Sequence, residues 1–146
     1  MRERVEPEEY RGVYNDEIRD GDLIIMGKEP EKTAGHICAE NGIYESLWRL
    51  SLETDLGLIV DVRRIPFDQS YIDRCNREDT NPYVIPTELI IYVSHPLSEY
   101  HLRKDLTVIG YLTKERVCRL INGDRYSFLS GEIASGLTVS DINSGL

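Results

Sequence analysis

The stretch ETDLGLIVDVRRI, residues 53–65, guides how the rest of the sequence is interpreted. At the two-residue period of a β-strand, Leu58 and Val60 point to one face. The carboxylate of Asp61 and the guanidinium of Arg63 then share the opposite face. A half-buried strand normally carries apolar residues at such positions, so this charged pair is a candidate functional site.

A third charged residue, Asp55, lies just before Gly57, where the chain can turn into this strand. Two acids and a base at this spacing could hold a divalent cation against a phosphate, because hard cations such as Mg²⁺ take oxygen ligands. Simpler interpretations stay open. Asp61 and Arg63 could form a salt bridge on a solvated face of the sheet, and Asp55 could be a turn residue.

The segment before this stretch predicts a helix. Thr33 can cap a helix that runs to about residue 50 or 52. Apolar residues recur there at helical spacing, and Glu40 interrupts them on the buried side. Glu40 is therefore either a site residue or a carboxylate at the margin of the stripe that reaches water. Residues 1–33 are acidic and polar, and we predict an N-terminal extension there, followed by a single domain over residues 34–146.

The segments after it predict further strands around a long connection. Residues 66–86 are polar and predict a lid, a binding loop or an insertion. Residues 87–94, TELIIYVS, predict a central strand covered on both faces. Residues 106–112 predict another strand, residues 113–121 a helix and residues 126–129 a last strand. This order predicts a mixed α/β (α+β) fold with a single central mixed β-sheet flanked by helices.

The composition restricts the classes of partner. The chain has 146 residues, a net charge of −9 and a pI of about 4.8, which counts against broad nonspecific binding of nucleic acid. A small site where a metal bridges protein and phosphate stays open, as does an acidic surface that meets a basic protein partner. Three widely spaced cysteines and the absence of a long apolar run lead us to expect a cytoplasmic protein without a membrane segment.

Taken together, these residues resemble the restriction-endonuclease-like superfamily, the PD-(D/E)XK nucleases. The resemblance covers residues 34–121, and the strand ELIIYV followed by VIGYLTKERV is similar to small phage and mobile-element members. It implies a restriction-endonuclease-like fold and Mg²⁺-dependent cleavage of phosphodiesters. Asp55 and Asp61 would bind the metal, Glu40 would support the metal or its water, and Arg63 would stabilise charge on the phosphate.

The sequence departs from this family pattern in three places. Thr54 stands where the family has proline, the second acid is Asp61 instead of the commoner glutamate, and Arg63 replaces a lysine. An arginine cannot easily give up its proton, so a general base is lost. We therefore expect a nuclease-like protein, active or inactive. Its contact with nucleic acid would be either local or made by a homodimer that gathers its few basic residues, and the sequence leaves the oligomeric state open. The alternative is an acidic, non-enzymatic inhibitor or accessory factor of a nucleic-acid-binding partner.

Overall fold

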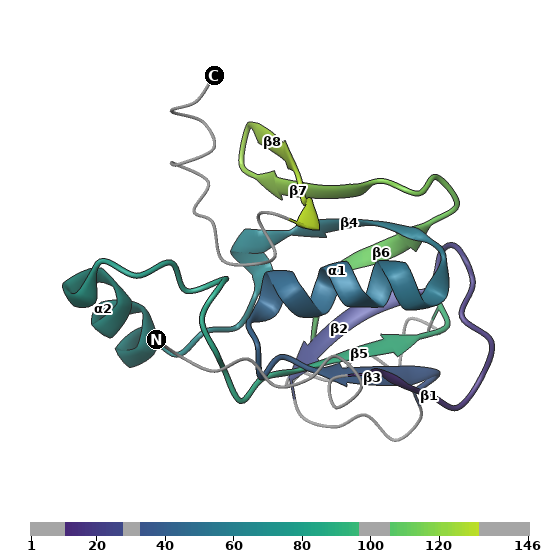
Figure 1. Cartoon of the computed structure of the whole chain (residues 1–146), viewed down its shortest axis with the longest axis horizontal. Helices are drawn as coiled ribbons and strands as arrows, with labels where there is room; N and C mark the ends of the chain where they lie inside the picture. The colour runs from purple at the N-terminus through teal and green to yellow at the C-terminus, as the bar shows by residue number, and fades with distance from the viewer. Residues whose placement is uncertain (1–10, 28–32, 97–105, 132–146) are drawn as a thin grey trace.

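The computed structural model describes residues 11–27, 33–96 and 106–131. These residues form an eight-stranded sheet in the order β1-β3-β5-β2-β6-β4-β7-β8. Neighbouring strands are antiparallel except β4 and β7, which run parallel. One face of this sheet is covered by α1, while α2 lies beyond one end of α1 (Figure 1). The predicted mixed α/β class with a central mixed sheet is confirmed.

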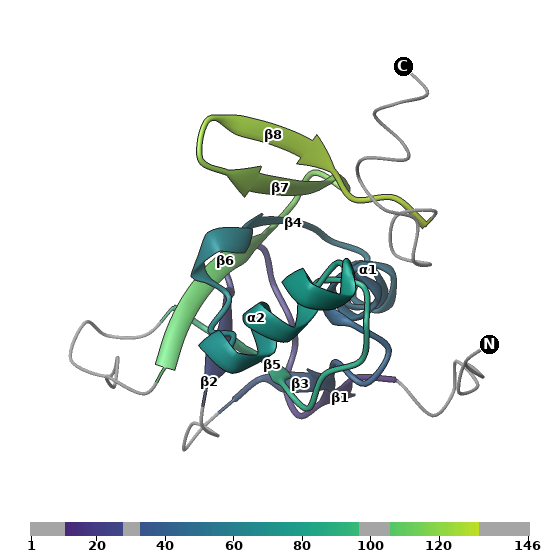
Figure 2. The same cartoon turned by 90° about the vertical axis from the view of Figure 1, so that its left-hand side faces the viewer.

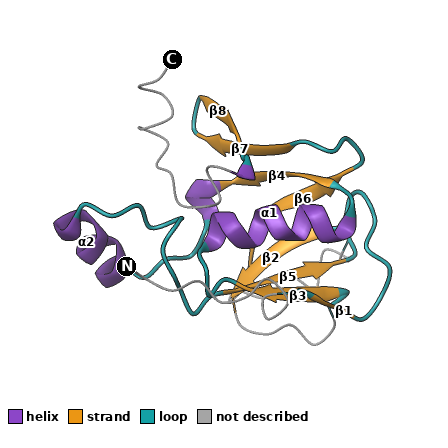
Figure 3. Ribbon diagram, viewed as in Figure 1, coloured by secondary structure: helices purple, strands orange, loops and turns teal. Residues whose placement is uncertain are grey.

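Helices and strands alternate irregularly along the chain, as the colouring in Figure 3 shows. The strands are β1 (Val13–Tyr14), β2 (Leu23–Gly27), β3 (Gly35–Cys38), β4 (Gly57–Asp61), β5 (Ile90–Ser94), β6 (Leu106–Thr113), β7 (Cys118–Asn122) and β8 (Arg125–Phe128). The helices are α1 (Ile43–Thr54), the short 3₁₀ helix η2 (Val62–Arg64) and α2 (Gln69–Glu78).

The centre of the sheet is built from the most apolar strands. In β2, Ile24, Ile25 and Met26 are completely buried, and this strand pairs with both β5 and β6. The predicted N-terminal extension therefore supplies β1 and the central strand β2. The domain division at residue 33 stays a prediction, but its two sides share one sheet.

The main core lies between α1 and the sheet. The helix turns Ile43, Leu47 and Leu50 inward, and the strands contribute apolar side chains such as Leu58 and Val60. Complete burial of one such side chain stabilises the fold by about 1.5–3 kcal/mol. The apolar period of α1 thus decides which side of the helix packs on the sheet.

Two predicted helices are wrong in part. The helix predicted from Thr33 begins only at Ile43, because residues 35–38 pair with β5 as strand β3. The helix predicted over residues 113–121 is replaced by a turn and β7. In β7 the buried residues Cys118 and Leu120 alternate with the less buried Arg119, so pairing with β4 gives a two-residue period where the sequence also fits a helical one.

Two other boundaries also differ. The long connection over residues 66–86 contains α2, whose exposed polar surface hides its helical character in the sequence. The strand predicted through residue 65 ends at Asp61, where the chain turns into η2. Asp61 starts this turn, because its carboxylate accepts a hydrogen bond from the Arg63 backbone N–H at 3.1 Å. Asp61 and Arg63 therefore do not share one strand face.

Neither of the two α-helices in the described segments reaches across a bilayer. α1 has 12 residues and α2 has 10, and neither is apolar along its whole length.

Candidate functional site

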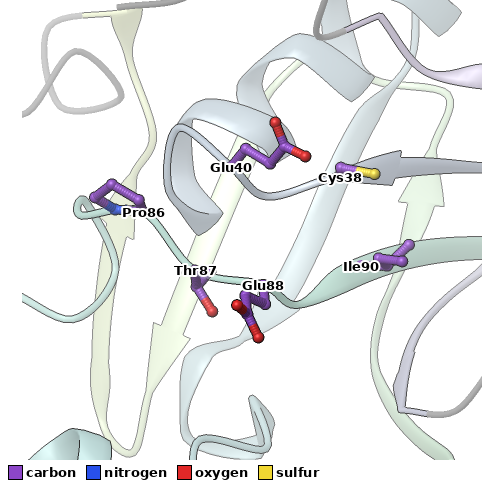
Figure 4. Close-up of a pocket in the computed structure, with 6 residues that line it drawn as sticks. All are labelled: Cys38, Glu40, Pro86, Thr87, Glu88 and Ile90. Atoms are coloured by element: carbon purple, nitrogen blue, oxygen red, sulfur yellow. The ribbon is translucent and has the colours of Figure 1, made fainter. Parts of the chain in front are cut away.

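A cavity opens where β3 ends and β5 begins. We call it the turn cavity; its volume is about 430 Å³. One wall is the end of β3 and the turn into α1, and the other is the segment that leads into β5 (Figure 4). Its lining residues are Cys38, Glu40, Pro86, Thr87, Glu88 and Ile90.

Backbone hydrogen bonds fix the two walls to one another. The Ala39 N–H donates to the Leu89 carbonyl at 3.0 Å, and the Thr87 N–H donates to the Ala39 carbonyl at 3.2 Å. The first turn of α1 is covered in the same way, since the Tyr44 N–H donates to the Tyr83 carbonyl at 2.9 Å. The turn cavity is therefore a preformed feature of the fold.

The turn into α1 depends on Gly42. Its φ of 106° and ψ of 158° lie in a region that is essentially restricted to glycine. A Cβ atom at this position would lie 2.9 Å from the backbone of Val84. Gly42 thus allows the chain of residues 81–87 to pack directly on the start of α1.

Next to this glycine lies a buried amide. Asn41 is 8% exposed, and its Nδ2 has no hydrogen-bond partner among the described residues. A buried donor without a partner costs about 1–3 kcal/mol. Such a cost is more often tolerated at functional sites than elsewhere, and this donor lies in the turn that forms one wall of the cavity.

The carboxylates of the turn cavity are not paired. Among the described residues, none forms an ion pair or a side-chain hydrogen bond with Glu40 or Glu88. Their carboxylates point away from one another (Figure 4). Burial, with the charge of Glu40, raises the pKa of the Cys38 thiol, so Cys38 is held as a thiol and not as a reactive thiolate.

The acidic residues predicted to share a metal do not come together. Glu40 and Asp55 flank α1 at opposite ends, and a helix of 12 residues is about 18 Å long. Asp61 lies at the far end of β4 from Asp55. No group of three or more potential metal ligands occurs in the part of the chain that the structure describes.

Each of the predicted residues has a local explanation. Asp55 is the left-handed C-terminal residue of α1 and forms an exposed ion pair of 2.8 Å with Arg116. Asp61 binds the Arg63 backbone, and the Arg63 Nε lies 3.6 Å from the same carboxylate oxygen. Of the predicted acids, Glu40 lines the turn cavity.

A second charged cluster lies at the other end of the sheet. His95, after β5, is hydrogen-bonded through Nδ1 to Asp22 and through Nε2 to Asp16, both at 2.9 Å. Asp22 is 1% exposed and also accepts a hydrogen bond from the Arg19 backbone N–H. The bonds to Asp22 and then Asp16 raise the pKa of His95, and the bond to His95 lowers the pKa of Asp16. This cluster pairs its charges internally.

Sequence reasoning missed the segment Pro86–Leu89, which was assigned to a loop and a strand. One feature of the sequence indicates this segment. Pro86 separates the polar residues 66–85 from the apolar strand, and the polar residues Thr87 and Glu88 follow it just before the strand. Proline has no backbone N–H to donate to a neighbouring strand, so strand pairing begins only after it. The polar residues between the proline and the strand are then left outside the sheet.

Several solved structures are similar to this chain in fold, among them the following three. HypE in complex with ATP superposes with a TM-score of 0.63 at 13% identity, over 79% of this chain and 52% of HypE. AaThiL in complex with AMPPCP and TMP gives 0.58 at 10% identity, over 83% and 54%. PurL of T. maritima in complex with ATP gives 0.58 at 16% identity, over 85% and 27%.

The fold is PurM-like. The chain spans about half the length of HypE and ThiL. No family profile matches the sequence, and no curated protein matches it. The restriction-endonuclease-like fold and the nuclease, hydrolase and phage assignments are wrong, because the solved structures that resemble this chain are PurM-like proteins. The misleading signal was the pair Asp61 and Arg63, which forms a turn at the end of β4.

Proposed function

We propose that this chain is a nucleotide-binding part of an ATP-utilising enzyme and that the turn cavity is the ligand site. The observation that carries this proposal is the PurM-like fold that the chain shares with HypE and PurL, both in complex with ATP, and with ThiL in complex with AMPPCP. Low identity transfers the fold alone, so the ligand is inferred from the cavity and tested below.

The size and lining of the cavity support this assignment. A volume of about 430 Å³ falls within the range of small-molecule sites, roughly 300–1,000 Å³. Pro86 and Ile90 supply apolar surface for a base or a ribose, and the Thr87 hydroxyl supplies a polar group. Rigid walls reduce the entropy that binding must overcome.

The charges of the cavity make a metal ion necessary for a triphosphate. The six lining residues include the carboxylates of Glu40 and Glu88 and no basic side chain, so they repel a free triphosphate. Protein sites commonly hold Mg²⁺ through one or two carboxylates plus the phosphates of the substrate. Glu40 fits that role, since it lines the turn cavity whereas Glu88 lines the neighbouring cavity as well, and bound Mg²⁺ would neutralise the phosphate charge.

Calorimetric titration with ATP and with AMPPCP, with Mg²⁺ and with EDTA, tests the proposal. We expect saturable binding of both nucleotides in Mg²⁺ and none in EDTA. Thermal unfolding should agree, since ligand at about 100 times Kd stabilises the native state by about 2.7 kcal/mol. No binding of either nucleotide in Mg²⁺ would contradict the proposal.

We also propose that the chain forms a homodimer through the open face of the sheet, which we define as the face opposite α1. Strand register places Ile59, Arg119 and Phe128 side by side on this face, and Asp61, Ile121 and Tyr126 in the next row. Tyr126 is 72% exposed and Phe128 is 60% exposed. Apolar side chains at such exposure favour association.

Charge complementarity favours a second copy over another partner. Asp61 and Arg119 carry opposite charges in adjacent rows of the open face, and each would exchange an ion pair within the chain, with Arg63 and with Glu115, for the pair between copies. In a two-fold arrangement, Asp61 of one copy would face Arg119 of the other, and the reverse pair would form as well. A two-fold contact is self-complementary in this way.

Light scattering after size exclusion tests the dimer. Phe128→Glu should convert a dimer to a monomer, whereas Leu52→Glu, an equally exposed apolar position on α1, should leave the mass unchanged. A monomeric wild-type chain at about 100 μM, well above ordinary dimer affinities, would contradict the proposal. Contacts with nucleic acid or a basic protein, and a cytoplasmic location, stay predictions.

A further inference from the structure

A second cavity lies between α2 and the segment that precedes β5. We call it the α2 cavity; its volume is about 380 Å³. It is bounded by residues 66–68 before α2, by Tyr71 and Arg74 on α2, and by residues 86–89. The view in Figure 2 has α2 at the front, so this side of the molecule faces the reader.

One wall of the α2 cavity is aromatic and fixed. The rings of Phe67 and Tyr71 stack with centroids 5.1 Å apart, and Phe67 also packs against Tyr83 at 5.5 Å. The Tyr71 hydroxyl donates a hydrogen bond of 3.1 Å to the Pro82 carbonyl. These contacts hold ring surface in place, which lowers the ordering cost for a flat ligand.

The carboxylate of Asp68 is not used by the fold. Asp68 occupies the N-cap of α2, where an aspartate side chain usually accepts a hydrogen bond from the helix. Here the side chain forms no capping bond, and the Tyr71 and Ile72 N–H groups donate to the Asp68 backbone carbonyl instead. The Asp68 carboxylate, which would normally cap the helix, is therefore left facing the cavity.

A second carboxylate and one cation complete the charges. Glu88 lines the cavity without an ion pair among the described residues. The Arg74 guanidinium lies over the Tyr71 ring, 5.6 Å from its centroid. With two acids and one base, the lining carries a net negative charge, and the Tyr71 ring already accepts a cation on its face.

We propose that the α2 cavity binds a small organic ligand in which an aromatic ring carries an ammonium group. The ligand ring packs against the edges of Phe67 and Tyr71, whose faces already contact one another, Tyr83 and Arg74. The ammonium group donates hydrogen bonds to Asp68 and Glu88. This ligand class differs from the nucleotide of the turn cavity, so the two proposals fail independently. Because Pro86, Thr87 and Glu88 line both cavities, the two ligands would contact one shared segment.

The test uses 2-phenylethylamine as the probe, with 3-phenylpropionate and butylamine as controls for charge and ring. Affinity is measured by calorimetry, and the site is mapped by backbone amide chemical shifts. We expect saturable binding of 2-phenylethylamine with shifts centred on residues 66–74 and 86–89. Each control should bind at least about threefold more weakly: 3-phenylpropionate because it lacks the charge pair, and butylamine because it lacks the ring surface that packs on the aromatic wall.

Three substitutions on α2 and its N-cap test whether the site binds a positively charged ligand. Asp68→Asn should weaken the probe at least about threefold, whereas Asp73→Asn, an exposed carboxylate bonded to Gln69, should not. Arg74→Gln should leave the affinity unchanged or raise it, because a like charge is removed. Shifts centred elsewhere, equal binding of 3-phenylpropionate, or weaker binding by Arg74→Gln would overturn the proposal.

Discussion

The carboxylates that line the turn cavity and those at the opposite end of the sheet are used in opposite ways. At the end where β3 and β4 finish, the carboxylates of Glu40 and Glu88 line a cavity without ion pairs among the described residues. At the other end, on the right of Figure 1, Asp22 is paired with His95 and Asp55 with Arg116. The first we call the cavity end and the second the paired end.

This difference separates structural from functional charge. A carboxylate that meets a cation within the fold has its charge compensated, and it contributes to local order. A carboxylate that faces a cavity keeps its charge for a ligand or a metal. The candidate site therefore lies at the cavity end, although two of the predicted site residues, Asp55 and Asp61, have local partners.

The largest effect we predict compares one glycine at each end. Gly42→Ala should destabilise the fold by about 3 kcal/mol, because the Cβ meets the Val84 backbone and the φ of 106° is strained. At the paired end, Gly21 has a φ of 86°, but a Cβ atom there would meet no other atom within 4 Å. Gly21→Ala should therefore lower the free energy of unfolding by only about 1 kcal/mol. Denaturant unfolding of both variants measures the two losses. Equal losses would show that the turn at Gly42 is not tightly packed.

A smaller effect concerns the ion pairs of His95 at the paired end. Its pKa is raised in the folded state by Asp22 and Asp16, so its stabilisation is complete below the pKa of an unfolded histidine. It is lost as the pH rises through the raised pKa. Toward acid, the contribution of Asp16 is lost as the pH falls through its lowered pKa.

Melting temperatures of the wild type and His95→Gln across pH 4–9 measure this dependence. The gap between them should be widest in mildly acidic buffer and should narrow toward alkaline pH. A gap that stays constant with pH would show that His95 stabilises the fold through packing alone.

The smallest effect belongs to Asp55. Asp55→Gly should change the unfolding free energy by less than about 0.5 kcal/mol or stabilise the fold, because glycine favours the left-handed C-cap. The ion pair that is lost is exposed on both sides and contributes little. Arg116→Ala serves as the control for that pair, and chemical denaturation measures both. A loss of 2 kcal/mol, about that of a buried pair, would contradict this view.

Part of the fold follows from the sequence. The apolar run of β5, ELIIYV, and the short run of β2 identify strands because their side chains are apolar on both faces. β6 ends at residue 113, one residue after the predicted end of this strand at residue 112. The helix predicted over residues 113–121 fails, because Val117, Leu120 and Ile121 recur at helical spacing whereas Cys118 and Leu120 fit the two-residue period of a strand, and only the pairing with β4 decides between the two periods.

The candidate site follows less well. Glu40 stands out in the sequence as a carboxylate among apolar residues, and the structure places it in a cavity wall. Glu88 comes from a segment 48 residues later, so only the backbone bonds between Ala39 and Leu89 reveal that the two are neighbours. The spacing of Asp55 and Asp61 imitated a metal motif because a C-cap and a strand end happen to flank β4.

The most direct test of the account compares one carboxylate from each end in a titration of Mg²⁺ and ATP. Glu40→Gln removes a charge that faces the cavity, and Asp55→Asn removes a charge at the paired end. Calorimetry should show ATP affinity reduced about tenfold by Glu40→Gln, or about 1.4 kcal/mol, and unchanged by Asp55→Asn. Equal affinities for the two variants, or a loss confined to Asp55→Asn, would contradict the assignment of the cavity end as the functional end.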